Sequence, residues 1–239
     1  MNLERIAVPD EAVKYILYQR TEYLRIPHTL AFRVINRLIP YPLFNRVVEW
    51  EARRNPSRIK ALYADDMRRE FRSIQAFLPR ACASILDIGC GVAGIDVLLN
   101  HHFKEEQPTF YLLDKTHVED SVFYGFHSRG AFYNSLVAAK ALMLANEISA
   151  QSVHLLEAND QHAIPLDGRV ELVISLISWG FHYPIQTYLD QVFALLAKGG
   201  TMIIDVRKQT EGLDMLGKRF AKVDVILEKS KYWRVLASK

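Results

Sequence analysis

The sequence predicts an α/β fold: a mostly parallel sheet with helices on both faces and a helical extension on its N-terminal side. Two patterns support this fold class. Short apolar runs rich in β-branched residues alternate with helix-like segments from about residue 85 onward. Residues 1–79 show helical periodicity without such runs, so we expect a helical extension at 1–79 and a sheet domain at 80–239.

Four helices are predicted in the N-terminal extension, with prolines between them. They span 11–25, 30–38, 43–54 and Ser57, as the cap, to about 77. Lys and Arg outnumber Asp and Glu here by 15 to 9 in residues 1–80, although the whole chain carries only +3. The basic residues indicate either a solvated helix face or a surface for an acidic partner such as RNA. The helices could cover the site, brace the fold or form a homodimer.

The segment 85–94, Ile-Leu-Asp-Ile-Gly-Cys-Gly-Val-Ala-Gly, is the most informative part of the chain. Its apolar start predicts a strand that is buried on both faces. Gly89 and Gly91 permit a turn that bulkier residues could not adopt, and they let a ligand approach the main chain. We expect Gly94 to let the following helix, 95–100, pack close to the strand. The segment predicts a nucleotide-sized site at the carboxyl end of a parallel strand.

Two kinds of cofactor fit the glycine spacing. The pattern Gly-x-Gly-x-x-Gly occurs in sites for dinucleotides such as NAD, and Asp114 follows at about the 20-residue distance of the ribose-binding acid. Asp114 closes the next predicted strand, 109–113. Asp87, just before the first glycine, would repel a pyrophosphate and attract a cationic amino-acid group. We therefore favour a cofactor that carries a cationic amino-acid group, and we keep an NAD dehydrogenase as an alternative.

The stretch 86–91 resembles motif I of the class I S-adenosylmethionine (SAM) methyltransferases. In that family the glycine turn holds the methionine end of SAM, and the acid that closes the second strand holds the ribose hydroxyls. The resemblance implies SAM as the cofactor and S-adenosylhomocysteine as its product. The implied contacts are Asp87, Gly89, Cys90 and Gly91 at the turn, with Asp114 and Lys115 after the second strand.

The resemblance continues downstream. After the predicted third strand, 153–156, the family has an Asp that accepts a hydrogen bond from the adenine amino group. Asp160 matches it best, with Asn159 and Gln161 as neighbours, and Ser175 is a further implied contact. The remaining predicted elements are strand 170–175, helix 189–197 stopped by Lys198-Gly199-Gly200, strand 201–206, and a closing pair at 221–227 and 232–237. They imply the family's seven-stranded, mostly parallel sheet with an antiparallel final strand.

Methyl transfer needs a site that aligns the acceptor with the methyl group and, for an alcohol, accepts a proton. In this family the segment after the fourth strand, here 175–184, faces the methyl group. His182 is the candidate base because an imidazole exchanges protons near neutral pH, although a structural histidine fits equally well. Tyr183 is a second catalytic candidate, and with Trp179 it is a candidate wall of the acceptor pocket.

Asp205 and Arg207, at the end of the fifth predicted strand, are expected to point toward the same pocket. Arg207 could clamp a carboxylate or phosphate of the acceptor. The sequence lacks the Asn/Asp-Pro-Pro-Tyr motif of amine methylases, the Pro-Cys pair of cytosine-C5 enzymes and a clear Asp-Asp-Asn metal trio. These features favour a small-molecule acceptor methylated on oxygen without a metal, similar to bacterial sugar O-methyltransferases. An RNA methyltransferase and a non-catalytic SAM-binding subunit are the alternatives.

An aromatic segment at 115–133 separates the ribose acid from the next predicted helix, 134–147. With His127 and Arg129, its aromatic rings could bind a ring or sugar face and an anion, or they could fill a small core beneath a long loop.

Bulk features suggest where the protein acts. The chain has no apolar run of about 18 residues and no signal peptide at its start. Cys82 and Cys90 are too few for a disulfide framework or a zinc site. We therefore expect a cytoplasmic protein whose partner is a small molecule, not a membrane or a nucleic acid.

Overall fold

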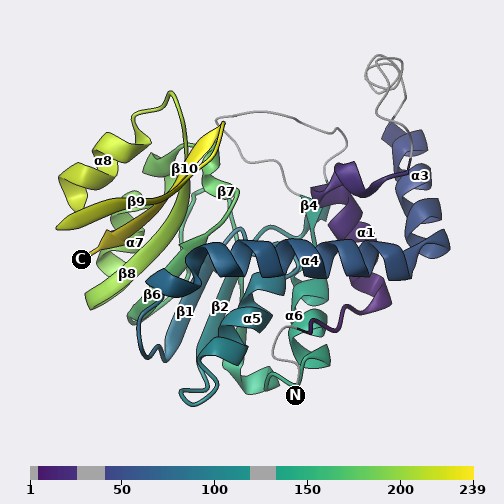
Figure 1. Ribbon diagram of the computed structural model, residues 1–239, viewed down its shortest axis with the longest axis horizontal. Helices are drawn as coiled ribbons and strands as arrows, with labels where there is room; N and C mark the ends of the chain where they lie inside the picture. Colours follow the sequence, from purple (N-terminus) through teal and green to yellow (C-terminus); the bar gives the residue numbers. More distant parts are fainter. Residues whose placement is uncertain (1–4, 26–40, 119–132) are drawn as a thin grey trace.

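A seven-stranded sheet forms the centre of the structure, a computed structural model that describes residues 5–25, 41–118 and 133–239 (Figure 1). Its strands are β1 Ser84–Ile88, β2 Thr109–Asp114, β5 Val153–Glu157, β6 Val170–Ser175, β8 Leu196–Arg207, β9 Lys222–Glu228 and β10 Tyr232–Ser238. They lie in the order β5-β2-β1-β6-β8-β10-β9. Strands β5, β2, β1, β6 and β8 are parallel, and β10 runs antiparallel to β8 and β9. The predicted sheet with its antiparallel final strand is confirmed.

Helices cover both faces of this sheet. The described helices include α1 Asp10–Gln19, α3 Tyr41–Arg54, α4 Pro56–Ile74, α5 Gly94–His102, α6 Leu136–Ala145, α7 Leu189–Leu195 and α8 Gly212–Arg219. Strand residues such as Ile85 and Ile203 pack toward α1, α4, α5 and α6, while their neighbours Leu86 and Ile204 pack toward α7 and α8. Figure 1 shows the long helix α4 lying across one face of the sheet. Within the described ranges, every helix is too short or too polar to cross a bilayer.

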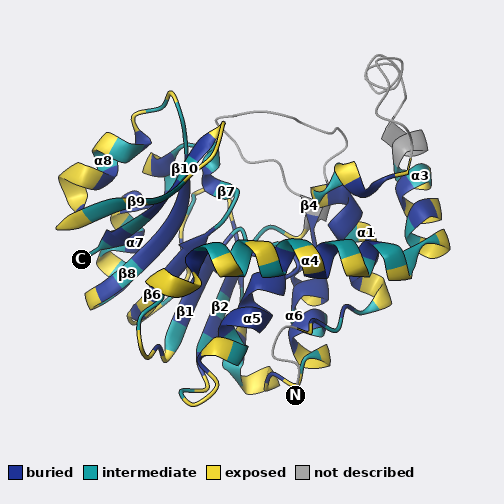
Figure 2. Ribbon diagram, viewed as in Figure 1, coloured by how far each residue is buried: buried dark blue, intermediate teal, exposed yellow. Residues whose placement is uncertain are grey.

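The N-terminal helices share a hydrophobic core with the sheet. Ile16 of α1, Val48 of α3 and Ile59 of α4 are fully buried in the same cluster as Ile85 of β1 (Figure 2). Removing such apolar surface from water is the main favourable term in packing two layers together. The described part of the extension therefore packs as a layer on the sheet domain.

Helix boundaries in the N-terminal region differ in part from those predicted. The helix expected to reach residue 25 ends at Gln19 and is followed by a 3-10 turn, Thr21–Tyr23. Helix α4 begins at Pro56, after the cap residue Asn55, so the predicted Ser57 cap is wrong. Proline is favoured at a first helical position because an N–H there has no partner within the helix. The predicted helix at 30–38 lies outside the described residues.

Two boundaries in the sheet domain also differ. The helix expected from residue 134 begins at Leu136, because the Ser135 side chain accepts a hydrogen bond from a first-turn N–H. The two preceding residues form a short strand, β4 Tyr133–Asn134, which pairs antiparallel with β3 His117–Val118. Strand β8 begins where α7 ends, so the segment 198–200 belongs to the strand and does not stop the helix.

Gly94 permits a close approach of α4, whereas we expected it to bring its own helix near the strand. A Cβ atom at Gly94 would lie 2.3 Å from the hydroxyl oxygen of Tyr63, a buried residue of α4. The Gly94 N–H donates a 3.0 Å hydrogen bond to that oxygen. This contact joins the N-terminal layer directly to the glycine-rich segment.

The Tyr63–Gly94 bond gives a test of this packing. Tyr63→Phe leaves a buried N–H without its partner, so the free energy of unfolding should fall by about 1–3 kcal/mol. Urea unfolding followed by circular dichroism measures the change. Tyr111→Phe, at a half-buried ring stacked on His154, is the matched control and should change stability by less than about 0.5 kcal/mol. Equal effects of the two variants would contradict the assignment.

Candidate functional site

The glycine turn after β1 is held in a conformation that favours glycine. The φ angles of Gly89 and Gly91 are 76° and 56°, in the left-handed region. A Cβ atom at Gly89 would lie 1.7 Å from Ser178 Oγ, and one at Gly91 would lie 2.8 Å from Gln19 Oε1. Two other parts of the chain thus approach the turn closely: the segment after β6, through Ser178, and the end of α1, through Gln19. Both glycines are required by backbone geometry and by packing.

Asp114 closes β2, as predicted, and its carboxylate points at this turn. Its carboxylate accepts hydrogen bonds from the N–H groups of Gly91 (2.9 Å) and Lys115 (2.7 Å) and from the Asn134 side chain (3.0 Å). Burial raises the pKa of Asp114 to about 6, while these three donors act in the opposite direction. The acid is therefore ionised at neutral pH and aligned with the turn.

Asn134 and Gln19 join the turn to the N-terminal layer, and the sequence did not single out either residue. The buried Asn134 amide donates to the Gly91 carbonyl as well as to Asp114. Its oxygen accepts a 3.2 Å hydrogen bond from Gln19 Nε2. No local motif marks such long-range contacts. The one sequence signal is the position of Asn134 directly before a helix-capping Ser.

Two further carboxyl groups lie buried behind the turn. Burial and the neighbouring Asp96 carboxyl raise the pKa of Asp87 well above its usual range. Burial raises the pKa of Asp96 to about 7, while hydrogen bonds from the Asp87 carboxyl and from the backbone N–H of Asp96 act in the opposite direction. The Cys90 thiol stays neutral because burial raises its pKa, as do the charges of Asp114 and Asp87. Three carboxyl groups therefore adjoin the turn, with Asp114 ionised at neutral pH, and Asp96 was not foreseen from the sequence.

The loop after β5 places its predicted residues beside Asp114. The Ala158 N–H donates to the Asp114 carbonyl (2.8 Å), and Lys115 forms an ion pair with Asp160 (3.3 Å). Asn159 Oδ1 accepts from the Ala163 N–H at 3.1 Å and so stabilises the loop itself. The side chains of Asn159, Asp160 and Gln161 are exposed. The loop and the end of β2 therefore form one edge of the site.

Ser175 and Trp179 lie inside the fold. The fully buried Ser175 hydroxyl donates to the Ile88 carbonyl (2.7 Å) and accepts from the Trp179 N–H (3.1 Å). These bonds connect the ends of β6 and β1. Ser175 would therefore affect a ligand only by fixing the position of these strand ends. Trp179 is also fully buried, and its indole donates to the Ile185 carbonyl. The expectation that Trp179 lines an open pocket is wrong, because its ring fills the core.

His182 and Tyr183 lie on an extended segment, β7 Ser178–Tyr183. The half-buried Tyr183 forms a hydrogen bond with Ser178, the residue that contacts Gly89. Burial raises the pKa of Tyr183 well above its usual value, so the phenol remains protonated and can donate a hydrogen bond. His182 is half-buried beside Phe181, with ring centroids 4.8 Å apart. Of the two side chains, only His182 suits a base at neutral pH.

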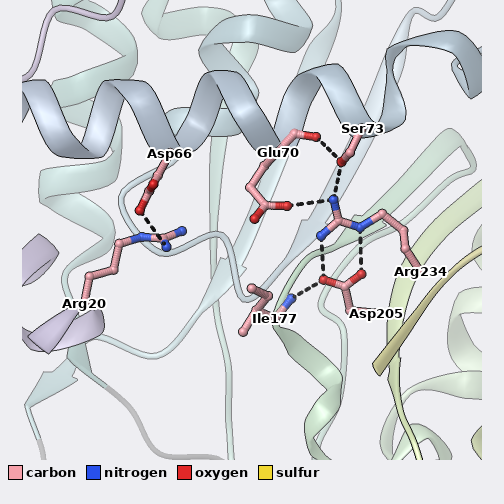
Figure 3. Close-up of polar contacts among 7 residues, drawn as sticks. All are labelled: Arg20, Asp66, Glu70, Ser73, Ile177, Asp205 and Arg234. Atoms are coloured by element: carbon pink, nitrogen blue, oxygen red, sulfur yellow. Dashed lines mark hydrogen bonds and ion pairs between the residues drawn. The ribbon is translucent and has the colours of Figure 1, made fainter. Parts of the chain in front are cut away.

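Asp205 and Arg207 have different surroundings. Asp205 is fully buried and paired with Arg234, so its predicted orientation toward the pocket is wrong (Figure 3). Arg207 is half-buried beside β7, where it donates to the Phe181 carbonyl at 3.4 Å and lies 5.4 Å from the centre of that ring. The aromatic candidates His127 and Arg129 lie outside the described residues.

Comparisons with known proteins identify the fold class of this chain. No protein-family model matches the sequence, and no curated protein matches it significantly. Precorrin-6y C5,15-methyltransferase from Geobacter metallireducens is similar in structure, with a TM-score of 0.50 and 14% identity over 70% of this chain and 87% of that one. A Nostoc punctiforme protein provisionally classed as an O-methyltransferase gives a TM-score of 0.52 and 13% identity, over 75% of this chain and only 58% of its own. The chain has the class I methyltransferase fold.

The paired acids behind the turn predict a pH dependence. Asp96 binds its proton more tightly in the folded state, so the free energy of unfolding should fall as pH rises from about 4 to about 7. Asp96→Asn removes this ionisation and gives Asp87 an amide donor. The variant should be more stable than the wild type at pH 8, by on the order of 2 kcal/mol, with a flatter pH profile.

Urea unfolding at pH 5 and pH 8 measures both effects, with Asp167→Asn on an exposed loop as the control. An unchanged pH slope in Asp96→Asn would count against a buried acid pair.

Proposed function

We propose that this chain is a SAM-dependent methyltransferase that acts on a small molecule, with a hydroxyl oxygen as the methyl acceptor. The observation that carries the proposal is the acidic glycine turn. The carboxyl groups of Asp96 and Asp114 both raise the pKa of Asp87. Asp114 also accepts a hydrogen bond from Gly91, in a turn whose backbone geometry favours glycine. The class I methyltransferase fold of the chain also supports the proposal.

The charge of the turn favours SAM over a dinucleotide. SAM carries a sulfonium and an ammonium, whereas NAD carries a pyrophosphate with two negative charges. Two like charges 4 Å apart repel by about 4 kcal/mol at the effective dielectric constant near a protein surface. The ionised Asp114 carboxylate and the neighbouring Asp87 and Asp96 carboxyl groups thus suit the cationic ligand. NAD binding remains the alternative outcome of the test below.

The residues of the turn suggest how SAM is held. Gly89, Cys90 and Gly91, with Asp87 behind them, would bind the methionine end. Asp114 would accept hydrogen bonds from the ribose hydroxyls, because its carboxylate already faces the turn. The adenine would lie along the edge that joins Lys115 to the loop Asn159–Gln161, which adjoins the end of β2.

When bound, SAM supplies a methyl group that its sulfonium already activates. The chain must hold the acceptor in line and remove its proton. His182 is the proposed base, and the protonated Tyr183, hydrogen-bonded to Ser178, would orient the acceptor oxygen near the turn. Arg207 would contribute a positive charge beside β7 for an acceptor that carries a carboxylate or phosphate.

A small-molecule acceptor fits the N-terminal layer better than RNA does. Several of its basic residues are already in ion pairs: Arg20 and Arg69 with Asp66, Arg58 with Glu51, and Lys60 with Asp10. Such pairs weaken the attraction for phosphates on which non-specific RNA affinity depends. Homodimer formation through these helices stays a prediction.

Cofactor binding can be tested by calorimetry with S-adenosylhomocysteine and NAD. We expect micromolar binding of the first and none of the second. Asp114→Asn removes a charged acceptor from the ribose hydroxyls, so its affinity should fall about 10- to 100-fold. Wild-type affinity should also fall below about pH 6, where Asp114 becomes protonated. Asp167→Asn, at an exposed carboxylate on the loop before β6, is the control; NAD binding without S-adenosylhomocysteine binding contradicts the proposal.

Catalysis can be tested with methyl-labelled SAM and a metabolite extract, followed by mass spectrometry of the labelled product. Once an acceptor is found, His182→Ala should lower kcat by about 10²- to 10⁴-fold without changing the affinity for S-adenosylhomocysteine. His102→Ala, an exposed histidine at the end of α5, should leave kcat unchanged. Full activity of His182→Ala would show that His182 is structural, and full activity of Tyr183→Phe and Arg207→Ala as well would favour a non-catalytic SAM-binding subunit.

A further inference from the structure

A buried charged cluster connects α4 to strands β8 and β10 on the face of the sheet that α4 covers. Arg234 of β10 is fully buried and donates two hydrogen bonds of 2.7 Å to the carboxylate of Asp205 on β8. The third nitrogen of its guanidinium group, Nη1, lies 2.7 Å from Glu70 Oε2 and donates to Ser73 Oγ at 2.5 Å, and both of these residues are on α4. Figure 3 shows this arrangement. Each charge in the cluster has a partner, as burial in the interior requires.

Asp205 also bonds to the turn between β6 and β7. Its Oδ2 atom accepts a 3.0 Å hydrogen bond from the Ile177 N–H. Ile177 has a φ of 52°, which is strained for a β-branched residue. A bond from a fully buried charged acceptor can hold a backbone in such a conformation.

This turn determines where the next residue lies. Ser178 follows Ile177 directly, and its hydroxyl lies where a Cβ atom of Gly89 would be. The same hydroxyl bonds to Tyr183. A change in the conformation of Ile177 would therefore move Ser178 away from the glycine turn and release Tyr183.

We propose that Asp205 is a positioning residue for the cofactor site: oriented by Arg234, it holds the Ile177 N–H and so keeps Ser178 and Tyr183 against the glycine turn. The inference rests on the proposed function, because its main readout is the affinity for S-adenosylhomocysteine. A buried ion pair is weak evidence for a role in stability, because a fold is often equally stable when two apolar residues replace the pair. The two-point alignment of Arg234 on Asp205 instead fixes the direction in which the carboxylate accepts the Ile177 bond.

The chain offers a matched control on the same helix. Asp66 lies on α4 near Glu70, and it bonds to Arg20 and Tyr23 in the N-terminal layer (Figure 3). Within the described residues, the hydrogen bonds and ion pairs of Asp66 go to Arg20, Tyr23 and Arg69, away from the Ile177 turn. Asp66→Asn should therefore reduce stability without affecting the cofactor site, whereas Asp205→Asn should affect both.

The experiment compares four proteins: wild type, Asp205→Asn, Arg234→Lys and Asp66→Asn. The measurements are the affinity for S-adenosylhomocysteine by calorimetry, the stability in urea, and the hydrogen exchange of the Ile177 and Ser178 amides. Asp205→Asn and Arg234→Lys should bind about tenfold more weakly, equivalent to about 1.4 kcal/mol, and should exchange faster at these amides. Asp66→Asn should match the wild type in affinity and in exchange at the turn. Arg234→Lys keeps the charge and serves if Asp205→Asn fails to fold.

A second substitution separates positioning from general destabilisation. Glycine adopts a φ of 52° without strain, so adding Ile177→Gly to Asp205→Asn should restore much of the affinity while leaving the loss of stability. Wild-type affinity in both Asp205→Asn and Arg234→Lys would overturn the inference, as would equal losses in Asp66→Asn.

A wild-type protein that binds no S-adenosylhomocysteine would overturn the proposed function instead. Amide exchange at Ile177 would then still decide the inference: faster exchange in Asp205→Asn than in Asp66→Asn supports positioning, and equal exchange overturns it.

Discussion

The left-handed turn at Gly89 and Gly91 is the constraint on which the rest of the site depends. It joins the end of β1 to the start of α5, and it leaves no room for a side chain at either glycine. Asp114 holds the turn from β2, Ser178 packs on it from β7, and Asn134 of β4 bonds to it and to Gln19 of the N-terminal layer. Long-range contacts thus set its conformation, and the site forms only when the whole domain has folded.

The charges of the molecule are divided between two regions. Basic residues of the N-terminal layer pair with acids of the same layer, as Arg20 does with Asp66. The glycine turn instead gathers carboxyl groups, and those of Asp96 and Asp114 raise the pKa of Asp87. A cationic cofactor would relieve this repulsion, so binding energy and the stability of the site would be linked. Asp205 shows another use of a buried charge, because Arg234 compensates it and leaves one lone pair for the backbone.

Local signals in the sequence predicted the seven strands of the main sheet and the acid at the end of β2. Apolar runs and the spacing of glycines each depend on residues close together in the chain. Asn134, Asp96 and the Asp205–Arg234 pair could not be found this way, because their roles arise from contacts between distant segments. Trp179 was assigned to a pocket wall for the same reason: an aromatic residue next to a site looks the same in the sequence whether its ring faces the ligand or the core.

A crystal structure of the protein with S-adenosylhomocysteine tests the central claim most directly. The account predicts the homocysteine end against Gly89–Gly91, both ribose hydroxyls within hydrogen-bond distance of the Asp114 carboxylate, and the sulfur on the side of the turn where Ser178 and Tyr183 lie. A ligand bound away from the glycine turn, or a ribose that does not contact Asp114, would contradict it.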